Sequence, residues 1–205
     1  MTTVQYYFAP VSPWTYLGHQ RMCDIARAHG AAIEVLPVDL GGKVFPLSGG
    51  LPLAKRAPQR QAYRLVELAR FSKWLDAPLN LQPKYFPVSG DDAARLIIAV
   101  DRHDGNAAAL RITGAVLRAV WAEERNIADE ATLAALLREC ELPARRLEDA
   151  HMQAVAERYD AYTQRAIDAG VFGAPSYVID GEIFWGQDRL DFVERWLAEI
   201  GRAHV

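Results

Sequence analysis

The sequence predicts an α/β fold in which a small β-sheet is interrupted by a long helical segment. Two β-prone runs, at residues 4–8 and 33–38, flank a helix expected from Pro13 to about His29. Helical periodicity then fills most of residues 59–168, and the chain closes with two short strands and a helix. A strand–helix–strand unit of this size implies parallel strands joined by a right-handed crossover.

The first helix has a clear start signal. Ser12 directly precedes Pro13. A serine side chain can accept a hydrogen bond from the first free N–H groups of a helix, and proline fits the first helical position because its missing N–H would have no partner there. We therefore expect Ser12 to be the N-cap of this helix. Gly30 is expected to end it.

Residues 39–58 interrupt the regular pattern. Glycine and proline are dense here, yet Val44, Phe45 and Leu47 make the segment too apolar for a disordered linker. A long ordered loop in a compact protein is usually functional. Passage from one subdomain to the next is the other interpretation, and both stay open.

The helical segment contains a further start signal. Ser89 with Asp92 resembles a capping box ahead of a helix over residues 93–102. Earlier in the segment, Tyr63, Val66 and Trp74 fall on one face of an expected amphipathic helix.

The stretch at residues 170–189 predicts a strand, a turn, a strand and a helix start. Asp-Gly at positions 180 and 181, between two β-prone runs, is a strong hairpin signal. Pro175 stands just before the first of these strands, where a cis peptide bond would be used. Gln187 and Asp188 fall in the first turn of the last helix. An edge hairpin capped by a helix is the purely structural interpretation.

Composition excludes several classes of partner. The net charge of −3 and the pI of about 6.0 argue against nucleic acid and anionic membranes, since both need a basic surface. No run approaches the length of a membrane span, and the N-terminus lacks the features of a signal peptide. Cys23 and Cys140 have no CxxC spacing, so we expect free thiols, no metal site and a cytoplasmic location.

The order of the elements is that of a thioredoxin fold, with a helical block after the second strand as in DsbA-like proteins. Redox members carry CxxC at the first strand–helix junction, because the helix N-terminus stabilises a thiolate. The equivalent residues here are Ser12, Pro13, Trp14 and Thr15. Hydroxyls stand at both sulfur positions, which excludes dithiol–disulfide exchange.

Two motifs carry a closer resemblance. VSPWTYLG at the first helix and GVFGAPSYVIDGEIFWGQDRL near the end resemble kappa-class glutathione transferases and bacterial 2-hydroxychromene-2-carboxylate isomerases, and the resemblance spans the whole chain. It implies a thioredoxin-like fold with a large all-helical insertion. The thioredoxin-like domain would be discontinuous, formed by residues 1–40 and 165–205, and residues 41–164 would form the helical insertion domain.

The same resemblance implies that glutathione is the cofactor and supplies the missing thiol. Ser12 would be the catalytic residue, donating a hydrogen bond that lowers the thiol pKa from about 8.5. Pro175 would be the family's cis-proline, and the backbone of Ala174 would pair with the cysteinyl part of glutathione. Gln187 and Asp188 would hold the γ-glutamyl end at a helix N-terminus. A plain N-cap role for Ser12 and an ordinary helix-start role for Asp188 are the alternatives.

Other positions match the family less closely. The family's loop asparagine is absent from residues 48–52, where Ser48 or the backbone would have to replace it. Arg60 and Glu67 stand where kappa enzymes carry glutathione-binding lysine and aspartate, although Arg60 could equally be a solvated helix charge. Four aromatic residues, which could also belong to the core, are expected to wall the substrate pocket: Trp14, Phe45, Tyr85 and Phe86.

The leading hypothesis is a glutathione-dependent isomerase of aromatic catabolism. It would act on an aromatic-derived unsaturated or chromene carboxylate by reversible addition of the thiolate to an activated C=C bond. The partners would be glutathione and a small aromatic carboxylate, and a homodimer is possible by the same resemblance. Four cations are candidates for the substrate carboxylate: Lys43, Lys55, Arg56 and Arg60.

Two other functions fit the same sequence. A kappa-class glutathione transferase or peroxidase would keep this site but release a conjugate or reduce a peroxide. A thioredoxin-fold protein without its cysteines could instead bind a peptide or a partner without catalysis.

Overall fold

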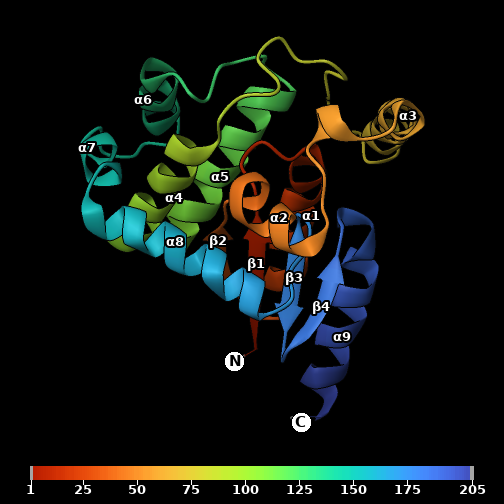
Figure 1. The fold of residues 1–205 in the computed structure, drawn as a ribbon. Helices are drawn as coiled ribbons and strands as arrows, with labels where there is room; N and C mark the ends of the chain where they lie inside the picture. Colours follow the sequence, from red (N-terminus) through yellow and green to blue (C-terminus); the bar gives the residue numbers. More distant parts are fainter. Residues whose placement is uncertain (1, 204–205) are drawn as a thin grey trace.

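A four-stranded mixed sheet forms the centre of the molecule (Figure 1). The computed structural model describes the backbone of residues 2–203 and the side chains of residues 2–200. The strands β1 (Thr3–Phe8), β2 (Ala32–Pro37), β3 (Ser176–Ile179) and β4 (Glu182–Trp185) lie in the order β2-β1-β3-β4. β1 is parallel to β2 and antiparallel to β3, and β3 is antiparallel to β4. The predicted thioredoxin-like α/β fold with a helical insertion is confirmed.

Helix α1 (Pro13–Ala28) provides the crossover between the parallel strands. Ser12 precedes it in an extended conformation, and its side chain accepts a hydrogen bond from the backbone of Thr15, as the predicted N-cap should. Gly30, at φ +62°, adopts the left-handed conformation that ends the helix. The local chemistry of the sequence therefore sets both ends of α1.

The predicted hairpin near the C-terminus is also confirmed. Asp180 and Gly181 have φ angles of 50° and 85°. Positive φ at both central residues is what a two-residue hairpin turn requires, because it matches the right-handed twist of the strands. Helix α9 (Leu190–Ala203) follows after a short 3₁₀ turn, η3 (Gln187–Arg189).

Residues 39–58 are more regular than the expected loop. They form a π-helical turn, η1 (Leu40–Val44), a single α turn, α2 (Phe45–Ser48), and a 3₁₀ turn, η2 (Leu53–Lys55). The Asp39 carboxylate accepts from the backbone of Gly42 at 2.7 Å, and Val44 is buried. The segment is therefore fixed by local hydrogen bonds and by one apolar anchor.

The remaining helices follow in chain order. They are α3 (Pro58–Trp74), α4 (Asp91–Asp104), α5 (Asn106–Trp121), α6 (Glu130–Glu139), α7 (Arg146–Ala150) and α8 (Gln153–Asp168). The capping box predicted at Ser89 and Asp92 is wrong, because α4 begins after Gly90. The Ser89 hydroxyl instead accepts from the backbone of Asp91 at 3.3 Å.

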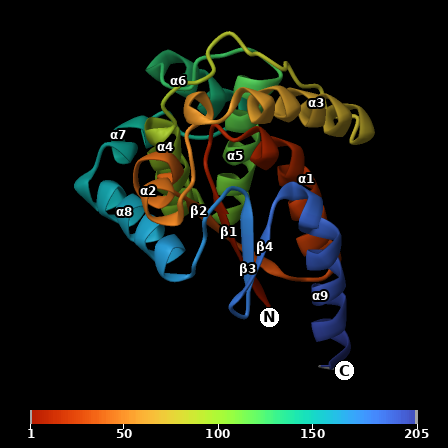
Figure 2. The ribbon, with the colours of Figure 1, turned by 45° about the vertical axis from the view of Figure 1, so that its right-hand side comes forward.

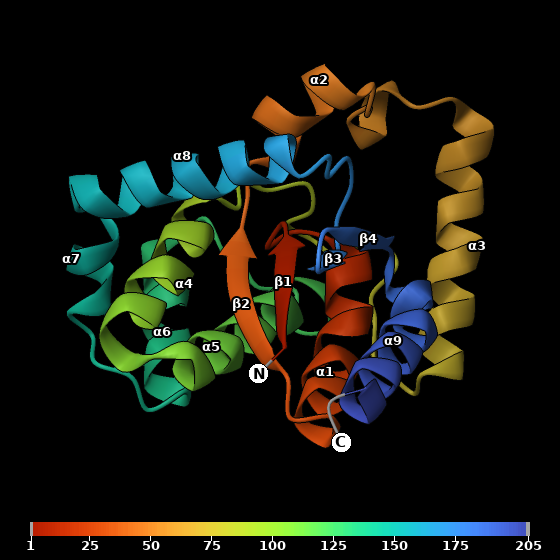
Figure 3. The same cartoon turned by 90° about the horizontal axis from the view of Figure 1, so that it is seen from below.

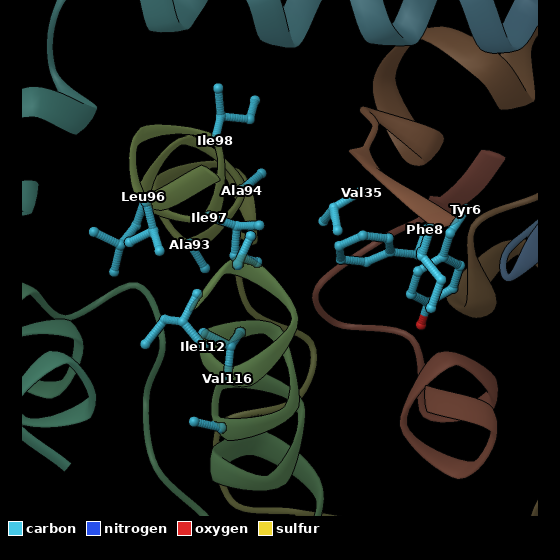
Figure 4. Close-up of a cluster of buried hydrophobic side chains, with 14 of the residues drawn as sticks. Tyr6, Phe8, Val35, Ala93, Ala94, Leu96, Ile97, Ile98, Ile112 and Val116 are labelled. Carbon is cyan, nitrogen blue, oxygen red and sulfur yellow. The ribbon is translucent and has the colours of Figure 1, made fainter. Parts of the chain in front are cut away.

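Helices cover both faces of the sheet (Figure 2). On one face, Tyr6, Phe8 and Val35 belong to a large core with side chains of α4 and α5, among them Ile97 and Ile112 (Figure 4). On the other face, a smaller cluster joins strand residues to α8. The inserted helices thus share one core with the sheet, and α8 runs through position 164 without a break. The division into a thioredoxin-like domain and a helical insertion domain stays a prediction.

Helix α3 differs from the others because it lies along the side of the molecule beyond α1 (Figure 3). Of its side chains only Leu68 is buried. Tyr63, Val66 and Trp74, which the pattern assigns to an apolar face, are 58%, 44% and 69% exposed. No helix in the part of the chain that the structure describes combines the length and apolar character of a membrane span.

Candidate functional site

Ser12 and the Ala174–Pro175 peptide, far apart in sequence, meet at the N-terminus of α1. The Ser12 side chain is buried. Its Oγ accepts from the Thr15 backbone N–H at 3.2 Å and donates to the Ala174 carbonyl at 3.4 Å. The first turn of α1 holds no acidic residue. The positive end of the helix dipole is therefore left without a compensating side-chain charge beside a hydroxyl donor.

The Ala174–Pro175 peptide bond is cis, in agreement with the prediction. The Pro175 carbonyl accepts from the Gly186 backbone at 2.9 Å, which links the start of β3 to the residue before η3. Within residues 2–203, the Ala174 N–H has no backbone or side-chain acceptor. A free donor in the segment just before β3, beside the Ser12 hydroxyl, can pair with an extended ligand.

Gln187 lies at the site with its side chain turned into the protein. It is 1% exposed, and Arg21 donates to both its backbone carbonyl and its side-chain oxygen, at 3.3 and 3.4 Å. A Cβ on Gly18 of α1 would lie only 2.8 Å from Gln187 Cβ, so the two elements touch closely. The Gln187 side-chain nitrogen is buried and has no partner among the described residues.

Asp188 is exposed, and its carboxylate forms an ion pair with Arg189 at 2.7 Å. Gly186, at φ +108°, lies close to this carboxylate. An added Cβ at this position would clash with Asp188 Oδ1. A carboxylate held at the start of η3 and α9 can meet an ammonium group of a ligand. Arg189 thus braces Asp188.

The two α3 candidates are not joined to this constellation. Arg60 is exposed, and Glu67 forms an ion pair with Arg70 at 2.7 Å. The hydrogen bond from Arg70 lowers the pKa of the Glu67 carboxyl. Among the described residues, no hydrogen bond or ion pair links Arg60 or Glu67 to Ser12 or Asp188.

The four predicted pocket aromatics do not form one continuous wall. Trp14, in the first turn of α1, packs edge-on against Phe71 of α3, with ring centres 6.0 Å apart. Phe86 packs instead against Trp121 at the end of α5, with ring centres 4.8 Å apart. Tyr85 is partly exposed beside Lys84, and Phe45 packs against Gly50. Trp14 and Phe86 are therefore the two of the four with defined aromatic partners.

Arg64 has an unusual environment that the sequence pattern does not reveal. Its guanidinium carbon lies 5.3 Å from the ring centre of Phe86 and 5.6 Å from that of Trp121. Burial and, secondly, the charge of Arg56 lower the pKa of Arg64 to about 10. The only sequence signal is the spacing of Arg56, Arg60 and Arg64 at four-residue intervals, which resembles an ordinary solvated helix face.

A cavity of about 460 Å³ lies elsewhere on α1. Its lining comes from the C-terminal half of α1 and the start of α5, including His19, Cys23 and Asn106. His19 Nε2 donates to the Leu110 carbonyl at 3.0 Å, and Nδ1 is hydrogen-bonded to the Tyr6 hydroxyl at 3.3 Å. Cys23 and Cys140 are both free thiols.

Comparison with known proteins gives a consistent result. The DSBA-like thioredoxin domain matches residues 3–198. The chain is 30% identical to a 2-hydroxychromene-2-carboxylate isomerase of Pseudomonas putida, covering 98% of this chain and 97% of that protein. It is 28% identical to the isomerase of the same name from Sphingobium xenophagum, covering 96% and 98%.

Solved structures agree with these relatives. A structure of 2-hydroxychromene-2-carboxylate isomerase superposes with a TM-score of 0.82 at 28% identity, covering 98% of this chain and 97% of the other. A probable DsbA oxidoreductase from Streptomyces coelicolor has a TM-score of 0.77 at 17% identity, covering 97% and 89%. The second likeness concerns the fold alone.

Proposed function

Because the chain belongs to the DSBA-like thioredoxin family, with 2-hydroxychromene-2-carboxylate isomerases among its relatives, we propose that it is a glutathione-dependent isomerase of an aromatic-derived unsaturated or chromene carboxylate. One observation carries the proposal. Ser12 stands at the N-terminus of α1, where this fold stabilises a thiolate, and its hydroxyl contacts the carbonyl before a cis-proline. The N-terminus of α1 therefore offers the environment for a thiolate, but no cysteine stands at positions 12–15.

The residues present fit glutathione. With serine and threonine at the two sulfur positions, the thiol has to come from a ligand. The Ala174 N–H is free to pair with the extended backbone of a tripeptide. Asp188, at the start of η3, suits an α-ammonium, while free N–H groups at that turn suit an α-carboxylate. When bound, glutathione would supply a thiolate for reversible addition to an activated C=C bond, so that the bond can rotate before elimination.

Ser12 has a defined task in this site. Its oxygen is oriented by the Thr15 N–H, and its proton points toward the Ala174 carbonyl over a long contact of 3.4 Å. Such a weak donor bond is readily exchanged for a stronger one to an anion. The Ser12 hydroxyl and the α1 dipole would both favour the charged form of a thiol and lower its pKa.

Gln187 would contribute mainly through position. Its side chain bonds Arg21 and packs against α1, so it ties η3 to the helix that carries Ser12. That arrangement favours a ligand contact through the backbone N–H of the turn. Arg60 and Glu67 stay candidates for the glycine end or the γ-glutamyl end of glutathione. They would have to give up solvent or the Arg70 ion pair to bind it.

A pair of assays tests the proposal. The protein is incubated with 2-hydroxychromene-2-carboxylate, with and without glutathione, and the isomer ratio is followed by absorbance. A parallel reaction contains glutathione and 1-chloro-2,4-dinitrobenzene. Isomerisation that depends on glutathione supports the proposal. Efficient conjugation without isomerisation would assign a kappa-class transferase, and neither reaction together with no glutathione binding would leave a non-catalytic binding protein.

A further inference from the structure

Arg64 is a partly buried cation without an acidic partner. Among the described residues it makes no ion pair and no hydrogen bond; its recorded contacts are the rings of Phe86 and Trp121. Guanidinium groups removed from water normally meet a carboxylate, because an uncompensated buried charge is costly. The environment of Arg64 thus lacks the anion that its chemistry calls for.

A second, independent observation concerns the indole of Trp121. This side chain is fully buried, and its N–H has no acceptor within the described part of the chain. Buried donors are satisfied in the great majority of cases. The Arg64 guanidinium thus packs against a ring whose own N–H also lacks an acceptor among the described residues.

The nearby acids are already engaged. Glu123, two residues after Trp121, pairs with Arg118 at 2.7 Å and with Arg125 at 3.2 Å. Glu124 accepts from the Lys84 backbone at 3.1 Å. Glu67, one turn further along α3, pairs with Arg70. Among the described residues none of these three carboxylates pairs with Arg64, which leaves it available to an anionic ligand.

The position of Arg64 connects it to the thiolate site. Arg64 and Phe71 are seven residues apart on α3, so they share a face and are separated by about 10 Å along the helix axis. Phe71 contacts Trp14 in the first turn of α1. The loop that carries Phe86 also approaches this end of α1, because a Cβ on Gly90 would lie 3.3 Å from Val11, the neighbour of Ser12.

The other candidate cations are less suited. Lys43 pairs with Asp160 at 2.7 Å on the surface. Arg56 donates to the Leu51 carbonyl at 2.8 Å, and Arg60 and Lys55 are exposed. Of these cations and Arg64, only Arg64 is held against two aromatic faces, where an aromatic ligand can also stack.

We propose that Arg64, packed against the Phe86 and Trp121 rings, binds the carboxylate of the aromatic substrate, with the Trp121 indole N–H as a second donor. The inference rests on the proposed function and names the residue that selects an acidic substrate. A planar guanidinium binds a carboxylate through two parallel hydrogen bonds. Partial burial strengthens such a bond compared with one at an open surface.

The test compares one ligand with its neutral counterpart. Calorimetric titrations with trans-2-hydroxycinnamate and with its amide are carried out on the full chain in saturating glutathione. The wild type should prefer the carboxylate by about tenfold or more, the range for a hydrogen-bonded charge. Arg64→Met should reduce the preference to within about twofold. Lys73→Met, which removes an exposed cation from the same helix, should leave it unchanged.

Several outcomes would overturn the proposal. These are no preference in the wild type, a preference that survives Arg64→Met, or a loss of glutathione affinity in that variant with the preference intact. The last result would assign Arg64 to glutathione. If Arg64→Met does not fold, Arg64→Lys replaces it. Since an ammonium keeps the charge without the fork, the preference must then fall by about threefold or more.

Failure of the inference is distinguishable from failure of the proposed function. If glutathione does not bind while the cinnamate preference depends on Arg64, the isomerase assignment fails and the carboxylate site stands. If glutathione-dependent isomerisation is found while the preference survives Arg64→Met, the function stands and this role of Arg64 is wrong.

Discussion

Replacing Ser12 with alanine removes one donor and one acceptor at the N-terminus of α1. The acceptor caps the helix through the Thr15 N–H at 3.2 Å, and the donor makes only the long 3.4 Å contact with Ala174. The lost cap should cost about 1 kcal/mol of stability, which corresponds to a fall in Tm of roughly 2–4 °C for a chain of this size. The fold should therefore survive the change.

The effect on glutathione should be much larger than the effect on the fold. A hydrogen bond to a charged group contributes about 1.5–3 kcal/mol, and one pKa unit corresponds to about 1.4 kcal/mol. Because Ser12 favours the thiolate, its loss should raise the pKa of the bound thiol by about 1–2 units. Activity should fall by about 10²–10³, the range for losing one oriented donor to an anion.

The two effects are separated by measuring thiolate absorbance against pH in the glutathione complex, beside the isomerisation rate. Thr132→Ala, which removes a hydroxyl from the first turn of α6, is the matched control and should change neither quantity. Ser12→Thr keeps the hydroxyl and should retain much of the activity. Full activity of Ser12→Ala with an unchanged thiol pKa would refute the hydrogen-bond role.

Two further predictions concern the framework of the site. Gly173→Ala would place a Cβ 2.3 Å from the Trp185 indole nitrogen, so it should destabilise the protein by about 1–3 kcal/mol in urea unfolding, whereas Gly41→Ala has open space and should change little. Burial lowers the pKa of His19 to about 4, against 6.5 in the unfolded chain, so the unfolded state binds the extra proton between these values. Stability is then fully present above pH 6.5 and falls by up to about 3 kcal/mol as the pH drops to 4. Unfolding of His19→Gln should lack this component, and an equal pH dependence in both proteins would contradict the assignment.

Much of the fold could be predicted from local sequence. Ser12 before Pro13, Gly30 and the Asp-Gly turn each fix a backbone conformation through their own side chain or through its absence, independent of the rest of the chain. The strand order and the packing of α4 and α5 on the sheet depend on long-range contacts. The closer family resemblance, more than residue spacing, anticipated them.

The wrong or incomplete predictions have identifiable causes. Ser89 can bond several nearby N–H groups, and in the folded chain Gly90 takes the cap position. Helix α3 has the periodicity of a buried helix, but periodicity alone does not say whether a partner surface is present. Turns at residues 40–55 depend on hydrogen bonds of Asp39 and on the burial of Val44, which composition does not reveal.

The motifs supplied the candidate site residues, whereas the surroundings of Arg64 are defined by tertiary contacts alone. Ser12, Ala174, Pro175 and Asp188 gather around the ends of α1 and β3, as the motifs suggested. The environment of Arg64 could not be predicted from the sequence, because an arginine on a helix is usually solvated. Its lack of a partner is visible only when the rings and the acids of other elements are in place.

We expect this chain to bind glutathione and to ionise its thiol beside Ser12. Calorimetric titration of the wild type with glutathione at pH 7, in two buffers of different ionisation enthalpy, measures the protons released on binding. A thiol with a pKa lowered from about 8.5 should release most of one proton, and S-methylglutathione should bind without release. No heat at millimolar glutathione would refute glutathione binding, and binding without proton release would refute ionisation of the thiol.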